Sequence, residues 1–354
     1  MIITLTSFNR RAFLRTTGAA LAASARPALS LFAAPVEPPR NLRVKLQPPP
    51  PASESIVKLL YQSLTPAQRK EICFAWDYID PKRGMLRTRV ENNWRITNPI
   101  VKSEFFSADQ QAMIRAIFEG ITNPDWHKRF DRQLADDLGG FGVNQSIALF
   151  GAPDTGKFEF VLASRHMTLR CDGDSAEHVA FGGPILYAHE GDDLHEKPHH
   201  PHNVFWHQAV EANKLYHALD AKHRELALVI KGMPTEELVG FKGREGKFQG
   251  CPVKEFAADQ KAELQRILNI LLEPFRTSDR DEVVRCLARQ GGLDACYLAF
   301  YKEGDLGDDG VYDNWRLEGP AFVWYFRGRP HVHVWVNIAD DPSPKLNSFQ
   351  NSIM

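Results

Sequence analysis

The spacing of apolar residues divides the chain into a helical first part and a later part that is richer in strands. Capping boxes begin two segments, at Thr65–Gln68 and Ser107–Gln110, because each pairs a Ser or Thr with a Gln three residues later. Apolar positions then recur at helical spacing, which predicts one helix to about residue 76 and helical structure from 107 toward 139, with a new start at Pro124. The N-terminal third is therefore predicted to be helical.

From about residue 146 the apolar period changes to two, which predicts strands. Three strand-like runs follow, SIALFG, KFEFVLASRHMTLRC and HVAFGGPILYA, and His166 is expected in the middle of the second. Helical spacing returns over about 203–230, 257–272 and 279–290, and three final strands are expected over 295–303, 321–326 and 331–338. This order predicts an α+β fold in which helices pack on a mainly antiparallel sheet.

The last expected strand carries two histidines. Successive side chains of a strand point to opposite faces, so one face holds Val332, Val334, Val336 and Ile338 and the other holds His331, His333, Trp335 and Asn337. The valine face is predicted to be a core face. A tight hairpin at Gly328–Arg329 would place Phe326 opposite His331 and Trp324 opposite His333, with aromatic rings beside both imidazoles. The histidine face is then either a part-exposed surface or the floor of a site.

Two imidazoles at positions i and i+2 of one strand can converge on one metal ion, and neutral imidazole is a common ligand of transition metals. His166 is the preferred third ligand, because Thr168 and Arg170 would share its face of an unusually polar strand. The three ring nitrogens would then lie within roughly 3–4 Å of one another. A core histidine at 166, hydrogen bonded to a backbone carbonyl, is the alternative. His189 and His207 are the next candidate ligands.

Glu318 and Arg170 are the candidate catalytic side chains. Arg170 is a candidate because it is expected on the face of His166. Glu318 could serve as a carboxylate ligand or a base. As a continuation of the strand through Trp324 it would lie about 20 Å from that residue, so it reaches the histidines only if Gly319–Pro320 bends the chain back.

Four segments carry a family resemblance: LTPAQRKEICFAW, SRHMTLR, LDAKHRELAL and WRLEGPAFVWYFRGRPHVHVWVN. Together they resemble the bacterial family of exported proteins classed as domain of unknown function 3500, over about residues 55–340. The resemblance implies that His166, Glu318, His331 and His333 belong to the family pattern. It implies no particular reaction.

The N-terminus resembles a twin-arginine export signal. Arg10 and Arg11 precede Phe13-Leu14 and an alanine-rich segment that ends in an A-x-A site at Ala25. The expected organisation is a signal peptide over 1–25, a Pro-rich leader over 26–52, a single α+β domain over 53–342 and a C-terminal tail over 343–354. The protein is therefore expected to be periplasmic or otherwise exported, with the twin-arginine translocase as a partner. No apolar run is long enough to predict a membrane span.

Composition narrows the chemistry. The formal net charge of -1 argues against a nucleic-acid partner, and the five cysteines form no CxxC motif. Nitrogen ligands without thiolate favour copper or zinc over magnesium or calcium, and iron is favoured only if a carboxylate joins two histidines. The expected cofactor is one transition-metal ion, with copper or zinc preferred to iron.

These features predict an exported metalloprotein with a mononuclear histidine-rich site. A metal-dependent enzyme acting on an unidentified small molecule is the preferred interpretation, oxidative with copper or iron and hydrolytic with zinc. The alternative is a non-catalytic metal-handling or partner-binding protein. Metal handling would use the loop histidines 195, 199, 200 and 202.

Overall fold

An eleven-stranded sheet organises the part of the chain that the computed structural model describes, residues 52–190, 204–236, 238–306, 309–345 and 347–348. The strand order is β1-β5-β6-β7-β8-β14-β13-β12-β11-β10, and β9 pairs with β11. Only the pairs β1–β5 and β9–β11 of this sheet are parallel, so the mainly antiparallel α+β prediction is confirmed. The strands are β1 (Cys73–Phe74), β5 (Ser146–Gly151), β6 (Phe158–Ser164), β7 (Met167–Cys171), β8 (Ile185–His189), β9 (Leu228–Val229), β10 (Cys251–Pro252), β11 (Tyr297–Tyr301), β12 (Asn314–Gly319), β13 (Phe322–Arg327) and β14 (Val332–Ile338).

Two short ribbons lie outside this sheet. They pair β2 (Ile79–Asp80) with β3 (Gly84–Met85), and β4 (Arg89–Val90) with β15 (Asn347–Ser348). The expected signal peptide and all of the expected leader except Ala52 lie outside the described residues, as do the loop histidines 195, 199, 200 and 202. No helix among the described residues is long and apolar enough to cross a membrane.

The helices begin largely where the sequence predicts. Both expected capping boxes are present: Thr65 caps α2, and Ser107 caps α3. α2 ends at Ile72, earlier than expected, because Cys73–Phe74 joins the sheet as β1. The helices are α1 (Ser53–Ser63), α2 (Pro66–Ile72), α3 (Ala108–Ile121), α4 (His127–Leu138), α5 (His207–Ala218), α6 (Ala221–Ala227), α7 (Ala258–Leu272) and α8 (Thr277–Gln290).

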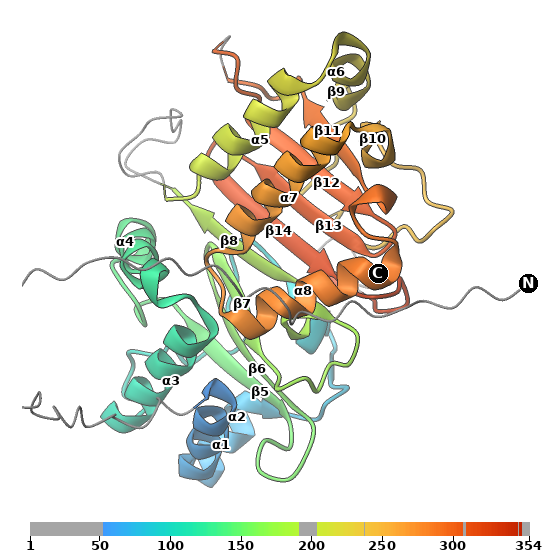
Figure 1. The fold of residues 1–354 in the computed structure, drawn as a ribbon. Coiled ribbons are helices and arrows are strands. Elements are labelled where there is room, and N and C mark those ends of the chain that lie inside the picture. The colour runs from blue at the N-terminus through green and yellow to red at the C-terminus, as the bar shows by residue number, and fades with distance from the viewer. Residues whose placement is uncertain (1–51, 191–203, 237, 307–308, 346, 349–354) are drawn as a thin grey trace, which may run out of the picture. The chain divides into compact units, whose positions relative to one another are not determined.

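The helices cover the valine face of the sheet. Figure 1 shows α5 and α7 lying across the C-terminal strands, and Val332, Val334, Val336 and Ile338 are buried in the same apolar cluster as residues of these helices. The predicted core face is thus confirmed.

The opposite face, which carries the histidines, is also buried. Two segments, residues 76–96 with their short strands and residues 229–241, cover it, and Val90, Val239 and Trp335 lie in one apolar cluster. Hydrogen bonds fasten these segments to the strands: Trp94 donates to Thr168 across 3.0 Å, and Tyr325 donates to the carbonyl of Pro234 across 2.9 Å. The histidine face is therefore an interior surface of the domain.

The predicted β13–β14 register is wrong. Phe326 pairs with Val334 instead of His331, and Arg327 pairs with His333. The chain turns later than expected because the Gly328 amide still donates to the Asp313 carbonyl across 2.9 Å. The register is shifted by three residues, and a shift by an odd number places a strand's side chains opposite the other face of its partner. Trp324 therefore lies on the helix-covered face, where it cannot flank His333.

Three further expectations needed correction. The run around SRHMTLR is two strands, β6 and β7, joined by a two-residue turn at Arg165-His166, so His166 is not in mid-strand. The helix expected to about residue 230 breaks at Leu219, and Asp220 caps α6. Residues 314–319 form a strand of their own, β12, which turns back at Pro320-Ala321 to pair with β13.

Candidate metal centre

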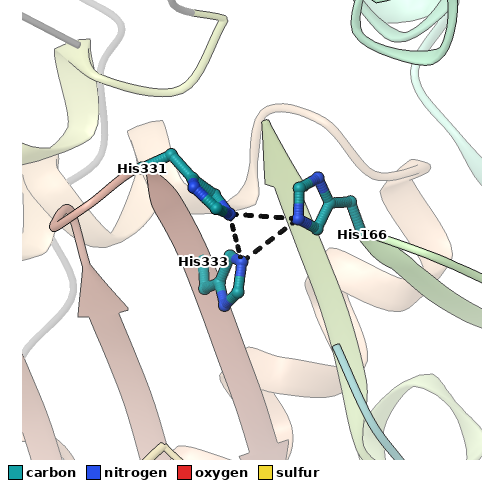
Figure 2. Close-up of side chains that lie close together, drawn as sticks. All are labelled: His166, His331 and His333. Atoms are coloured by element: carbon teal, nitrogen blue, oxygen red, sulfur yellow. Dashed lines mark hydrogen bonds between the residues drawn. The ribbon is translucent and has the colours of Figure 1, made fainter. Parts of the chain in front are cut away.

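Three histidines converge on one point at the end of the central strands. The Nε2 atom of His166 lies 3.1 Å from Nε2 of His331 and 3.2 Å from Nε2 of His333, and the latter two atoms are 2.8 Å apart. Figure 2 shows the three rings with these nitrogens turned toward one another. The predicted proximity of His166 to both other histidines is confirmed.

The backbone holds the two halves of this cluster in place. His333 belongs to β14, and His331 directly precedes this strand. His166 directly precedes β7, which is separated from β14 in the sheet by β8 alone. His166 adopts a left-handed conformation, with φ of 62°. Its amide donates to the Asn92 carbonyl across 2.7 Å, and its carbonyl accepts from the Ala188 amide across 3.0 Å. Hydrogen bonds therefore hold the turn that contains His166 to Asn92 on one side and to Ala188 of β8 on the other.

The geometry suits one metal ion. Nitrogens bound at 2.0–2.1 Å in tetrahedral directions are roughly 3.3 Å apart, and the observed separations of 2.8–3.2 Å are close to this. The histidines expose only 2% (His166), 9% (His331) and 3% (His333) of their surface, so water cannot easily satisfy their nitrogens. Facing lone pairs in a buried site need a cation or a proton between them. The triad could hold a metal ion, and no other His, Cys, Asp or Glu of the described residues joins this group.

Carboxylates stand behind two of the three rings. Oδ2 of Asp137, at the end of α4, lies 3.1 Å from Nδ1 of His166, at ion-pair distance without hydrogen-bond geometry. Oε1 of Glu236 lies 2.5 Å from Nδ1 of His333. A ring that binds a metal through Nε2 carries its proton on Nδ1, and that proton is typically donated to a carboxylate or carbonyl. Both carboxylates therefore favour the tautomer that metal binding requires, although a nitrogen of Arg327, which can only donate, also lies 2.5 Å from Nδ1 of His333 and opposes that tautomer.

Burial keeps the imidazoles of His331 and His333 neutral. It lowers the pKa of His331 to about 2, with further lowering by His333 and His166. Burial also lowers the pKa of His333 to about 4, although Glu236 partly opposes this. Neutral imidazole is the metal-binding form, so at neutral pH no proton has to leave these two rings before an ion binds.

Glu236 is the most connected of the groups around the triad. Its Oε1 also lies 3.2 Å from the Trp335 indole nitrogen, which donates to it, and 2.8 Å from Nε of Arg327. Burial opposes its ionisation, but the hydrogen bond with His333, the charge of Arg327 and the hydrogen bond from Trp335 outweigh burial, and the pKa of Glu236 falls to about 2. It is therefore a carboxylate at every ordinary pH.

The structure does not bring His189 and His207 to the triad. His189 pairs with Val332 in the sheet and so points to the opposite face from His333, and its ring contacts Asp136 at 3.2 Å and the Val204 amide at 3.2 Å. His207 begins α5, with its ring 5.6 Å from that of Trp126. Burial lowers the pKa of His207 to about 4.

Glu318 and Arg170 lie on the histidine face but away from the triad. Glu318 pairs with Val323, and Val323 pairs with Asn337. Asn337 is four residues along β14 from His333, about 13 Å away, and Glu318 is farther still because it lies two strands across the sheet from β14. It binds Arg316 at 2.7 Å and Lys242 at 2.9 Å. Arg170 is buried in β7 and donates to Glu159 and to the Pro184 and Arg89 carbonyls, each across 2.6 Å. Its contacts are those of a structural residue.

A family model described as "Protein of unknown function (DUF3500)" matches residues 54–335. The chain belongs to the DUF3500 family. The matched range includes all three histidines of the triad. No curated protein matches the chain, and no solved structure does.

Sequence reasoning did not find the two carboxylates behind the triad of this DUF3500 protein. Asp137 lies in a helix that ends 28 residues before His166, and Glu236 lies in an irregular segment 97 residues before His333. Neither has a spacing relation to the histidines along the chain. Only the packing of α4 and of residues 229–241 on the sheet places them there.

Proposed function

We propose that this protein is a metal-dependent enzyme built on one mononuclear centre with His166, His331 and His333 as ligands. The observation that supports it is the convergence of three buried Nε2 atoms within 3.2 Å of one another. Residues from two distant parts of the chain form this cluster, and the cost of burying three facing lone pairs is hard to offset without an ion.

The ligand set favours zinc or copper. Three neutral nitrogens and no thiolate suit either metal, whereas the iron sites of many oxygenases combine two histidines with a carboxylate ligand. Asp137 and Glu236 contact Nδ1 atoms, on the far side of the rings from Nε2, so they serve as partners of ligands. Carboxylate–histidine–zinc arrangements of this kind are common, and we therefore place zinc first.

Three protein ligands leave a coordination position for water or substrate, which is the pattern of catalytic zinc sites. Zinc held by His166, His331 and His333 would lower the pKa of a coordinated water to about 7 and so supply a nucleophile. We propose hydrolysis as the reaction class. Copper at the same ligands would make the chemistry oxidative, and metal analysis separates the two.

Metal handling is the weaker interpretation for this site. A protein that passes metal to a partner needs ligands that release the ion readily, but carboxylates at 2.5 Å and 3.1 Å hold the rings of His333 and His166 in place. One tightly held ion per chain, insensitive to deletion of residues 195–202, supports the enzyme. Several weakly held ions that are lost with that loop support handling.

The experiment is reconstitution of metal-free protein with zinc or copper, followed by assays with ester, phosphoester and amide substrates and with oxidisable phenols. Zinc-dependent hydrolysis that is lost in His333→Ala and kept in His217→Ala, an exposed histidine on α5, supports the proposal. Hydrolysis that persists in His333→Ala, or that does not require metal, refutes it.

We also propose that the twin-arginine translocase exports the protein to the periplasm. The supporting observation is the Arg10-Arg11 pair before Phe13-Leu14 and the A-x-A site. Changing both arginines to lysine should retain the precursor in the cytoplasm, as cell fractionation would show. An unchanged periplasmic amount contradicts this location.

A further inference from the structure

A second candidate site lies at the other end of the histidine face. It is a cavity of about 470 Å³, within the range of about 300–1,000 Å³ that small-molecule sites occupy. Asn337 of β14 lines it, four residues from His333 and so about 13 Å from the triad. Trp335, which is fully buried, lies between them on the same strand face. The cavity is therefore separate from the metal centre.

Positive charge predominates in the lining of this cavity. Three cationic side chains line it, Arg87, Lys157 and Lys345, against one carboxylate, Glu177. The Glu177 side chain is 82% exposed, so water largely screens its charge. Lys157 and Lys345 are exposed and form no ion pair with a described carboxylate.

Arg87 is held in place by protein contacts that leave one edge of its guanidinium available. Its Nε donates to the Trp76 carbonyl across 3.1 Å, and one terminal nitrogen donates to Glu159 across 3.0 Å. The other terminal nitrogen has no partner among the described residues. Glu159 is itself shared with Arg170, so it balances Arg87 only in part.

Apolar side chains around the Trp76 indole form much of the remaining wall, which also includes the polar side chains of Thr88, Asn337 and Ser343. The Arg87 guanidinium lies 4.0 Å and the Lys157 ammonium 4.5 Å from the centre of the Trp76 ring. Met85, Val179 and Pro184 add apolar surface. Gly183 also lines the cavity, and its backbone packs closely on buried Arg170, because a Cβ there would lie 3.2 Å from Nε of that residue. The cavity thus combines a cationic rim with an apolar body.

We propose that this cavity binds a small organic anion that carries an apolar or aromatic body. The anionic group lies between Lys157 and the free edge of Arg87, with Lys345 at the rim, and the body packs on the apolar wall beside Trp76. A carboxylate and a phosphate monoester are both anionic groups that accept hydrogen bonds, and lysine ammonium groups and arginine bind both.

The test is isothermal titration calorimetry on the full chain at low salt with benzoate, phenyl phosphate, inorganic phosphate and benzyl alcohol. At least one aromatic anion should bind saturably and more tightly than inorganic phosphate, which lacks the body, and than benzyl alcohol, which lacks the charge. The tighter of the two aromatic anions identifies a carboxylate or a phosphate site. Raising the salt should weaken binding.

Lys157→Gln should weaken that binding about tenfold, the usual effect of losing one charge-assisted contact. The matched control is Lys128→Gln, an exposed lysine on α4 that does not line the cavity and should leave binding unchanged. The double variant His331→Ala/His333→Ala should also bind the anion normally, which separates this site from anion binding to a metal.

The proposal is overturned if neither aromatic anion binds saturably, if benzyl alcohol binds as tightly, or if Lys157→Gln and Lys128→Gln behave alike. Loss of anion binding in the folded double histidine variant also overturns it, because the anion then belongs to the metal centre. Lys157 is exposed, next to β6, so its substitution should not prevent folding, and circular dichroism checks this.

Discussion

Replacing Glu236 by Gln should weaken zinc binding about 10- to 100-fold, the usual effect of removing a group that orients a histidine ligand. In the folded protein one oxygen of Glu236 meets Nδ1 of His333 at 2.5 Å, Nε1 of Trp335 at 3.2 Å and Nε of Arg327 at 2.8 Å. Gln keeps an oxygen that can accept hydrogen bonds but removes the negative charge. The substitution therefore isolates the electrostatic support that Glu236 gives to His333.

The expected loss of zinc affinity depends on the charge that Glu236 carries. Because the pKa of Glu236 is lowered to about 2, the side chain is fully ionised at neutral pH. A 10- to 100-fold loss corresponds to about 1.4–2.7 kcal/mol of zinc-binding free energy. The same ionised carboxylate stabilises the folded state above pH ~4.5, and this stabilisation should disappear as the pH falls toward 2, where the group becomes protonated.

The assay is competition for zinc between the protein and a chromogenic chelator at neutral pH, with the melting temperature measured with and without zinc. Glu225→Gln, at an exposed position on α6, is the matched control and should bind zinc as the wild type does. Zinc should raise the melting temperature less in Glu236→Gln than in the wild type at a fixed zinc concentration. Equal zinc affinity in Glu236→Gln and Glu225→Gln would refute the role given to Glu236.

Three other changes test the site and its framework. His331→Ala and His333→Ala should each remove most of the bound metal and leave the far-ultraviolet circular dichroism unchanged, because the opposite valine face carries the packing; metal retained by both variants contradicts the ligand set. Burial and Asp172 raise the Glu282 pKa to about 7, so the wild type loses stability as the pH rises from 4.5 to 7. Glu282→Gln should therefore raise the free energy of unfolding in urea by about 1 kcal/mol at pH 8 and leave it unchanged at pH 4.5. Equal stabilisation at both pH values would show that ionisation is not the cause. Arg170→Met should cost about 3–5 kcal/mol of unfolding free energy, because it leaves Glu159 buried with one partner fewer; adding Glu159→Leu should restore part of the loss, and no restoration in this double variant would argue against a buried charge as the cause.

Local chemistry and periodicity were enough to predict the fold class and to select the three histidines that converge in the structure. The alternation in residues 331–338 identifies both the valine core face and the two histidines, because a strand in a sheet leaves each side chain only two directions. The capping boxes at Thr65 and Ser107 fix helix starts in the same local way.

Features that depend on tertiary contacts were harder to predict. His166 was selected correctly but placed in mid-strand, since Arg165-His166 contains none of the Gly, Asn or Asp residues that usually mark a two-residue hairpin turn. The register of β13 and β14 depends on the hydrogen bond of Gly328 to Asp313, on the neighbouring β12 side, which no local pattern reveals. Asp137 and Glu236 reach the triad only through packing of their own segments on the sheet.

The most direct test of the central claim is X-ray absorption at the metal edge of the full chain after saturation with zinc and removal of excess ion. The account predicts one zinc per chain, three imidazole nitrogens at about 2.0–2.1 Å with one further light ligand, and loss of this spectrum in His166→Ala. Sulfur in the first coordination shell would contradict the claim. So would an unchanged zinc content and spectrum in His166→Ala, because the ion would then be bound elsewhere.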